Sequence, residues 1–251
     1  MITQRWLNLT GLVLTVAVLA WAGPIRAAEL DSDNDGLTDE AETTIYHTDP
    51  QGPDTDGDGF NDGDEVGQGL SPLHGDKRKL VGVDSDKDYL SDAWEIALGT
   101  DLTNPDTDGD KYLDGTEVIA GYDPLTPELN KLDKLIIVDL KKQHLTYLMG
   151  GKKLEDFPIS SGIKRLPTPT GDFKVLHKMP IVHYKGLGYD YPNTKWNLHF
   201  TTGASRFYIH GAYWHNDFGK PKSHGCVNVS YQNMERLYNW AQVGTPIKIT
   251  G

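Results

Sequence analysis

The chain has 251 residues, of which 37% are hydrophobic, a formal net charge of −12 and a single cysteine. This length accommodates one large domain or two small ones, and a single cysteine excludes a fold held together by a disulfide framework. An acidic chain of this kind also gives no reason to expect a nucleic-acid partner.

The first 28 residues have the pattern of a secretory signal peptide. Arg5 precedes an apolar run from Leu12 to Trp21, and two cleavage motifs follow, ending at Ala22 and Ala27. The run is too short to favour a permanent membrane span, although an uncleaved anchor is the alternative. No later segment is apolar for long enough to cross a bilayer. We therefore expect an exported protein of the periplasm or extracellular cell wall, with no stable membrane span.

Charge divides the rest of the chain into two blocks. Residues 29–129 hold 28 acidic and 5 basic side chains, a net charge of −23. Residues 130–251 hold 8 acidic and 17 basic side chains, a net charge of +9. Because such blocks indicate different roles, we predict one domain over 29–129 and a second over 130–251.

The acidic block contains four similar segments: DSDNDGLTDEAE (31–42), DTDGDGFNDGDE (54–65), DSDKDYLSDAWE (84–95) and DTDGDKYLDGTE (106–117), here loops 1 to 4. Each has Asp at its first, third, fifth and ninth positions and Glu at its twelfth. This is the ligand spacing of the EF-hand calcium loop, which also uses the seventh backbone carbonyl. The candidate ligands are Asp31, Asp33, Asp35, Leu37, Asp39 and Glu42; Asp54, Asp56, Asp58, Phe60, Asp62 and Glu65; Asp84, Asp86, Asp88, Leu90, Asp92 and Glu95; and Asp106, Asp108, Asp110, Tyr112, Asp114 and Glu117.

The register of these carboxylates argues against a disordered acidic tail, as does the large apolar or aromatic residue at every seventh position. The loops resemble bacterial thrombospondin type 3 calcium-binding repeats over residues 31–125, which implies calcium as a structural cofactor. A basic insertion over 73–83 is expected to separate two pairs of repeats.

The sixth loop position normally needs glycine for a sharp turn. Gly36 and Gly59 satisfy this in loops 1 and 2, whereas loops 3 and 4 have Tyr89 and Lys111, so weaker or distorted sites are expected there. Short helices should follow the later loops and end at the glycines of LGT and AGY, Gly99 and Gly121.

The basic block is expected to be a mainly β domain. Strand-forming runs cover 134–140 and 143–149 and precede a Gly-Gly hairpin turn, and further strands are expected within 167–178, 196–203, 206–211 and 245–250. A helix is predicted from the Ser230 cap to about Ala241, with Met234, Leu237 and Tyr238 on its inner face.

The lone Cys226 lies in the motif SHGCVN. In an oxidising compartment an unpaired cysteine indicates a reactive thiol or an intermolecular disulfide, and a buried inert thiol is the alternative. A nucleophilic thiol needs a base, and His210, His215 and His224 are available. His210 ends an apolar β run and precedes a glycine, which makes it the best candidate. Gly225 leaves room for backbone N–H groups to face an oxyanion.

The HG pair followed by SHGCVN resembles the L,D-transpeptidase catalytic domain family, and the PTPTG and VDL segments match its N-terminal part, so the resemblance covers residues 134–250. It implies a β-sandwich-like catalytic domain. We therefore expect a mainly β fold in which this domain carries the one predicted helix and follows an array of EF-hand-like loops with short helices. The resemblance also implies Cys226 as nucleophile, His210 as its base and the Gly211 carbonyl as the group that orients His210. The remaining motif positions are Ser223, His224, Gly225 and Asn228, and Tyr213, Trp214 and His215 are candidates either for the substrate groove or for simple packing.

Several functions remain open at this point. The favoured one is a transpeptidase that acts on peptidoglycan stem peptides through a Cys thioester and needs no cofactor for catalysis, with the repeat arm available to other envelope proteins. An L,D-carboxypeptidase or other hydrolase would share the thioester. A zinc enzyme using the histidines and Cys226 lacks a justifiable ligand spacing. A papain-like hydrolase has Cys before His, the reverse of this order, and a calcium-dependent wall-binding scaffold leaves the SHGC motif unexplained.

Overall fold

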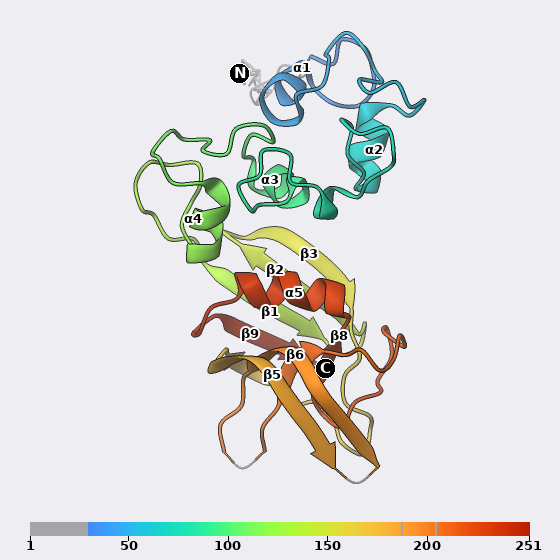
Figure 1. The fold of residues 1–251 in the computed structure, drawn as a ribbon, viewed down its shortest axis with the longest axis vertical. Coiled ribbons are helices and arrows are strands. Elements are labelled where there is room, and N and C mark those ends of the chain that lie inside the picture. The colour runs from blue at the N-terminus through green and yellow to red at the C-terminus, as the bar shows by residue number, and fades with distance from the viewer. Residues whose placement is uncertain (1–29, 187, 204) are drawn as a thin grey trace, which may run out of the picture.

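The computed structural model describes residues 30–186, 188–203 and 205–251. The predicted signal peptide over 1–28 lies outside these residues. Within the described ranges, no helix combines the length and the apolar character needed to cross a membrane. The acidic repeats, blue to green in Figure 1, lie at one end of the molecule, and the β domain, yellow to red, lies at the other.

The acidic block consists of loops joined by short helices. The helices are α1 (Asp39–Ala41), which continues into a π-helical turn (Glu42–Tyr46), α2 (Asp62–Gln68), α3 (Asp92–Leu98) and α4 (Asp114–Ala120). A 3₁₀ turn (Leu80–Gly82) lies in the basic insertion. As predicted, α3 and α4 end at Gly99 and Gly121, whose φ angles of 86° and 88° are left-handed.

The loops associate in two pairs, as the basic insertion predicted. In the first pair, the Gly63 N–H at the start of α2 donates to Asp35 Oδ2 of loop 1 at 2.9 Å. In the second, the Gly115 N–H donates to Asp88 Oδ2 of loop 3 at 2.6 Å. A Cβ on Gly115 would lie 2.5 Å from the Asp88 carbonyl oxygen, so the two backbones meet too closely for any other residue.

The strands of the β domain form two sheets. One has the order β3-β2-β1-β9-β4, with strands Lys152–Pro158, His144–Met149, Lys134–Asp139, Pro246–Thr250 and Gly171–Lys174. The other has the order β5-β6-β7-β8, with strands His177–Gly186, Tyr189–His199, Tyr208–Gly211 and Val227–Val229. The β1–β9 and β7–β8 pairs are parallel and the other pairs are antiparallel. This arrangement confirms the predicted mainly β domain and the β-sandwich-like fold that the family resemblance implied.

The long β5–β6 hairpin differs from the sequence prediction, which placed one strand within 167–178 and the next at 196–203. The structure continues the strand pairing through 177–186 and 189–199, where the hairpin projects from the domain (Figure 1). No residue of β5 is fully buried. Because neither face of β5 enters the core, its sequence has no apolar alternation to signal a strand.

Helix α5 (Tyr231–Trp240) begins at Ser230, whose hydroxyl accepts a hydrogen bond from the Asn233 N–H. As predicted, Met234 and Leu237 are fully buried, while Tyr238 packs at the core margin. The helix faces β6 and β7 and meets the first sheet through Trp240, which contacts Tyr147 at a ring distance of 4.9 Å.

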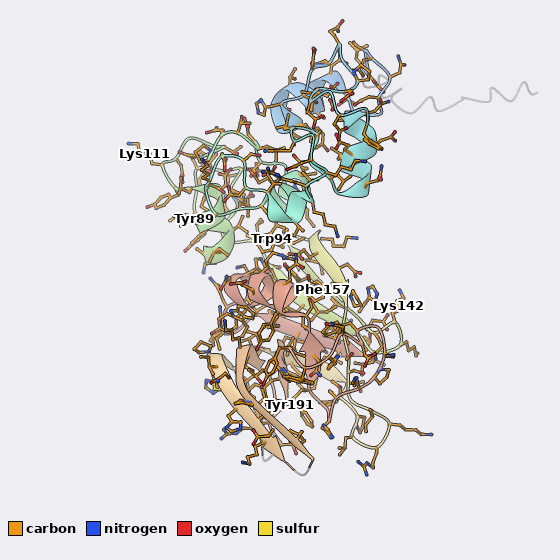
Figure 2. The ribbon with its side chains drawn as sticks, turned by 45° about the vertical axis from the view of Figure 1, so that its right-hand side comes forward. Tyr89, Trp94, Lys111, Lys142, Phe157 and Tyr191 are labelled. Atoms are coloured by element: carbon orange, nitrogen blue, oxygen red, sulfur yellow. The ribbon has the colours of Figure 1, made fainter. Side chains whose placement is uncertain are left out.

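The hydrophobic core crosses the predicted domain boundary at residues 129 and 130. Leu90, Trp94, Leu98 and Val118 of the repeats belong to the same buried cluster as the strands of the β domain and α5. Figure 2 shows Trp94 at this junction, close to the first strands of the β domain. The second pair of repeats is therefore packed on the β domain.

Candidate active site and cation-binding loops

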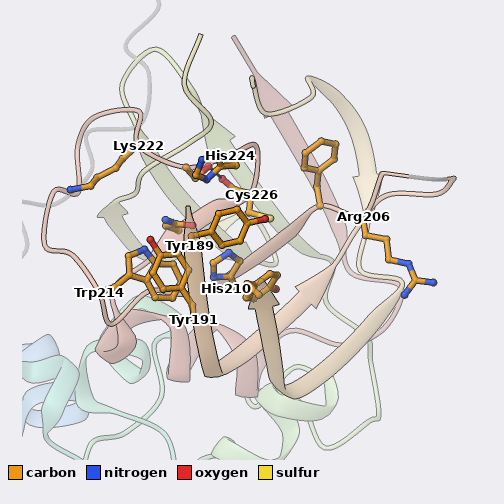
Figure 3. A pocket seen from close by; sticks show the side chains of 12 residues that line it. Tyr189, Tyr191, Arg206, His210, Trp214, Lys222, His224 and Cys226 are labelled. Carbon is orange, nitrogen blue, oxygen red and sulfur yellow. Dashed lines mark hydrogen bonds between the residues drawn. The ribbon is translucent and has the colours of Figure 1, made fainter. Parts of the chain in front are cut away.

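The β7–β8 pair brings the predicted nucleophile and base to one face of the second sheet. His210 of β7 pairs with Asn228 of β8 in register. Since side chains alternate along a strand, Cys226, two residues before Asn228, projects to the same face as His210. The intervening Val227 points to the opposite face and is fully buried in the core. Figure 3 shows Cys226 and His210 in the wall of one cavity.

The His210 ring is fixed by two neighbours. Its Nδ1 lies 2.9 Å from the Gly211 carbonyl oxygen, and a carbonyl only accepts, so Nδ1 carries the proton and Nε2 keeps a lone pair. Tyr184 of β5 stacks on the ring at 4.6 Å, and its hydroxyl donates to Asn197 Oδ1 at 2.9 Å. Burial lowers the pKa of His210 to about 4, so the imidazole is neutral at physiological pH and available as a base.

The Cys226 thiol is half-buried and also neutral. Burial raises its pKa to about 11, although a backbone hydrogen bond at Tyr208 acts in the opposite direction. The cavity wall therefore holds a neutral thiol and a neutral imidazole, and any reaction in which this thiol is the nucleophile would require a base to take its proton.

Ser223 and Gly225 hold the turn that carries Cys226. The Ser223 hydroxyl donates to the Cys226 carbonyl and accepts from the Gly225 N–H, the latter at 3.1 Å. The Gly225 carbonyl accepts from the Thr168 hydroxyl at 2.9 Å. A Cβ on Gly225 would lie 2.3 Å from the Phe207 ring, which explains the glycine. The Gly225 N–H is bonded to the Ser223 hydroxyl, so the room that Gly225 leaves would serve a different backbone N–H group.

The cavity around Cys226 has largely aromatic walls. Trp214 stacks on Tyr191 with a ring distance of 3.9 Å, and the exposed His224 stacks on Tyr189 at 5.0 Å. The lining residues are Tyr184, Tyr189, Tyr191, Arg206, Phe207, His210, Trp214, Lys222, Ser223, His224, Cys226 and Asn228. Trp214 and Asn228 thus line the cavity, as their proposed substrate contacts require.

The other two proposed substrate residues lie beside the cavity. His215 is buried behind the wall, where its Nε2 lies 3.0 Å from the side-chain amide of Asn228 and its Nδ1 lies 3.2 Å from the Asp217 backbone nitrogen. Tyr213 turns its hydroxyl away, to the Pro192 carbonyl at 2.9 Å. His215 therefore contacts the side chain of Asn228 from behind the cavity wall.

Sequence reasoning missed the side chains that the β5–β6 hairpin contributes to the cavity. Tyr184, Tyr189 and Tyr191 all come from this hairpin. The alternation of Tyr189 and Tyr191 beside a glycine turn was the available signal. It did not reveal which distant segment these rings would face.

The four loops gather carboxylates as a cation site requires. In every loop, oxygens of the first, third and fifth aspartates lie within 4.8 Å of one another. The ninth aspartate has a different role in the observed hydrogen bonds. In loop 2, Asp62 accepts from the Thr55 N–H at 3.0 Å and from its hydroxyl at 2.6 Å, and the other loops repeat this bond pair. It therefore braces the start of its loop, and its direct ligation of an ion stays a prediction.

Buried carboxylate oxygens without a partner among the described residues mark the same loops. They include one oxygen from each third-position aspartate and at least one from each closing glutamate. Burial raises the pKa of Glu42, Glu65 and Glu117 to about 7 and that of Glu95 to about 9. Buried carboxylates without a positive partner destabilise a fold, so these donor sets fit a hard cation with oxygen ligands, such as calcium.

The sixth position has the same backbone conformation in all four loops. Its φ is 103° at Gly36 and 92° at Gly59, and it is 79° at Tyr89 and 82° at Lys111. The backbone of loops 3 and 4 therefore follows that of loops 1 and 2, contrary to the expected distortion. A left-handed non-glycine residue costs about 1–3 kcal/mol, so weaker binding at these two loops stays a prediction.

Together, the second sheet and its loops bring one thiol and one oriented imidazole into the wall of a single cavity. Residues 133–249 match the family described as the L,D-transpeptidase catalytic domain. Residues 31–53, 54–69, 84–105 and 106–127 each match the bacterial TSP3 repeat. The chain belongs to the L,D-transpeptidase catalytic domain family through its C-terminal part and carries bacterial TSP3 repeats before it.

Known relatives match the same part of the chain. "L,D-transpeptidase 1" of Mycobacterium tuberculosis is 29% identical over 146 residues, which are 54% of this chain and 58% of the relative. An L,D-transpeptidase structure from Mycobacterium smegmatis is 28% identical, covers 49% of this chain and 60% of its own, and has a TM-score of 0.45. The catalytic domain of an E. faecium L,D-transpeptidase is 30% identical and covers 47% of this chain and 97% of its own, with a TM-score of 0.42. The chain thus spans 58% of the length of this curated relative.

Proposed function

We propose that this protein is an exported cysteine acyltransferase of the L,D-transpeptidase type, acting on peptidoglycan stem peptides. The observation that carries the proposal is the placement of Cys226 and His210 on one sheet face, with Nδ1 of His210 held by the Gly211 carbonyl. The aromatic cavity around them suits an extended peptide, because aromatic walls give a large contact area. Family membership and the relatives' names support the same reaction class.

The reaction follows from the neutral thiol and imidazole. Cys226 Sγ attacks a carbonyl carbon of the donor stem peptide while its proton passes to His210 Nε2. The carbon–nitrogen bond then breaks, the departing amine takes that proton, and a thioester remains. An amine of a second stem peptide attacks the thioester and gives its proton to His210, and the thiolate leaving group takes a proton back. Since the Gly225 N–H is engaged, the Cys226 N–H is the proposed oxyanion donor.

Incubation of the full chain with purified muropeptides, followed by mass spectrometry, tests this function. Cys226→Ala should form no product, and a carbapenem should add covalently to the wild type only. His210→Ala should lose about 100- to 10,000-fold in rate, as expected for a general base. His144→Ala is the matched control, since His144 lies on β2 and pairs with Asp156 outside the cavity. Product formation by Cys226→Ala, or an equal loss in both histidine variants, would remove the assignment.

Hydrolysis of the same thioester is the second candidate. The cavity is open enough for His224 to remain exposed at its rim, so water has access to the site. The same mass spectra separate the outcomes, because transfer joins two stem peptides and hydrolysis shortens one. A stoichiometric zinc ion in the purified chain would instead replace the thiolate mechanism with a metal site.

The repeats are proposed to bind calcium as a structural cofactor, with up to four ions and tighter binding in loops 1 and 2. When bound, each ion would supply the positive charge that the unpartnered oxygens of Glu42, Glu65, Glu95 and Glu117 lack. Calorimetric titration of the full chain with calcium tests the number of sites. A chain that binds no calcium at millimolar concentration would be inconsistent with this role. The arm is further proposed as the surface offered to other envelope proteins.

A further inference from the structure

Loop 3 continues directly into a helix that packs on the β domain. Trp94 lies in α3 next to the closing Glu95 and is 5% exposed. Its ring contacts Tyr147 of β2 edge-on at 5.7 Å, and its Nε1 donates to Glu155 Oε1 of β3 at 3.1 Å. At the end of the same helix, the Leu98 carbonyl accepts from the Lys152 ammonium. A change in α3 therefore reaches β3 directly.

Glu155 also contacts helix α5. It forms a two-pronged ion pair with Arg236, with Nε–Oε1 and Nη2–Oε2 distances of 2.7 Å each. The Tyr147 hydroxyl donates to the same carboxylate at 2.5 Å. Both charged side chains are largely buried, so the pair is geometrically fixed and poorly screened.

The N-terminal end of helix α5 packs against the candidate active site. It follows β8, the strand that carries Asn228, after the single cap residue Ser230. The Tyr231 ring lies where a Cβ of Gly211 would be, 2.5 Å away, so Tyr231 packs directly on the peptide whose carbonyl orients His210. The Tyr231 hydroxyl also accepts from the Lys195 N–H at 3.1 Å.

Loop 4 reaches α5 by a second route. The buried Lys134 ammonium donates to the Ile119 carbonyl of α4 and to the Trp240 carbonyl of α5, both at 2.8 Å. Gln242 Nε2 donates to the same Ile119 carbonyl at 2.8 Å. One buried side-chain nitrogen thus holds the C-terminal carbonyls of a repeat helix and of α5 together.

Loops 1 and 2 are attached differently. Hydrogen bonds from the first pair lead to the second pair: His47 Nε2 lies 2.6 Å from Asp101 Oδ1, and the Leu102 N–H donates to the Ile45 carbonyl at 3.4 Å. For residues 31–65, the described hydrogen bonds include none to residues 130–251. The two pairs of repeats therefore differ in their connection to the catalytic domain.

We propose that loops 3 and 4 are a calcium-dependent part of the catalytic domain, which positions His210 through Trp94, Glu155, Arg236 and α5. Loops 1 and 2 form the separable part of the arm. Glu95 is fully buried, with one oxygen unpartnered among the described residues, so a cation in loop 3 would tie α3 in place. Loss of that cation loosens α3 and with it the support of α5. The proposal rests on the calcium-binding role given above and not on the transfer reaction.

Hydrogen exchange on the full chain tests this linkage, in a Cys226→Ala background so that the readout is independent of catalysis. The matched variants are Glu95→Gln and Glu65→Gln, which alter fully buried closing glutamates of loops 3 and 2. Each should lose one calcium ion in calorimetry. With calcium present, only Glu95→Gln should speed amide exchange in α5. It should also lower the melting temperature of the catalytic domain, by roughly 5–10 °C when the calcium concentration is about 100 times the Kd of the lost site. Chelation of the unmodified loops should reproduce this result.

A second variant covers the case in which Glu95→Gln does not fold. Trp94→Phe keeps every calcium ligand but removes the bond to Glu155, so it should bind the same number of ions while the response of α5 exchange to them becomes smaller, with only the Lys134 route from loop 4 intact. With Cys226 restored, its kcat should fall while KM is unchanged, since the change reaches His210 and not the cavity wall.

If the chain with unmodified loops binds calcium but amide exchange in α5 does not change, the linkage is overturned while the calcium sites remain supported. Equal α5 responses to Glu95→Gln and Glu65→Gln would also overturn it. Absence of calcium binding would instead remove the sites themselves.

Discussion

The neutral state of the Cys226 thiol predicts an unusual reactivity profile. Burial raises its pKa from 9.0 to about 11, a change of about two units, so the thiolate fraction is about 100-fold lower than for an unperturbed thiol. At pH 7 about one molecule in 10,000 carries the thiolate. Alkylation by iodoacetamide should therefore be slow and should rise about tenfold per pH unit from pH 6 to pH 10, because only the thiolate reacts.

The assay is unambiguous because Cys226 is the only cysteine in the chain, so any alkylated cysteine reports this thiol. The transfer reaction should behave differently, since His210 takes the proton during attack. Burial lowers the pKa of His210 to about 4, so kcat/KM should decline only as pH falls through about 4 and the base becomes protonated. An alkylation rate that is flat between pH 6 and pH 8 would indicate a preformed thiolate–imidazolium pair and refute this reasoning.

Two further predictions concern the repeats. Gly63→Ala and Gly67→Ala place the same methyl group in α2, but the Cβ at Gly63 would lie 2.3 Å from the Asp35 carbonyl oxygen, whereas Gly67 has open space. In calcium, thermal melting should show that Gly63→Ala lowers the free energy of unfolding by about 1–3 kcal/mol through overpacking. Gly67→Ala should raise it by about 0.5–1 kcal/mol through helix propensity. Similar shifts for the two variants would contradict the loop pairing. In chelator, the raised folded-state pKa of Glu95, about 9 against 4.5, contributes stability below pH 4.5 that is lost as pH rises toward 9. The calcium-free melting temperature should therefore fall between pH 5 and pH 9, and a rise over this range would show that the carboxylate is compensated by another group.

Local patterns explain why much of the site was predictable from sequence. In every loop, aspartate side chains accept hydrogen bonds from backbone N–H groups of the same loop, as when the Gly57 N–H donates to Asp54 Oδ1 at 2.9 Å. The positions of the candidate ligands therefore depend only on the twelve residues of the loop. Helix α5 was equally predictable, because its cap residue and the residues of its buried face all lie within one short segment. The HG and SHGC motifs are local in the same way, and the fold brings their candidate residues His210 and Cys226 to one cavity.

Contacts between distant segments account for what was missed. Leu37 and Leu90 at the seventh loop position are buried, whereas Phe60 and Tyr112 at the same position are exposed. The repeat itself is identical in pattern, and only the pairing of odd with even loops determines which side faces inward.

The sequence by itself determined which candidate reactive groups this protein carries, because a twelve-residue carboxylate register and a Cys–His motif are local arrangements. Only the tertiary structure decided how these groups work together. The β5–β6 hairpin brings Tyr184 onto His210 from 26 positions earlier in the chain, and α3 joins Trp94 to Glu155 across 61 positions. Such contacts depend on which surfaces remain apolar once each helix and strand has formed. Burial of those surfaces against one another packs the second pair of acidic repeats onto the core of the basic domain.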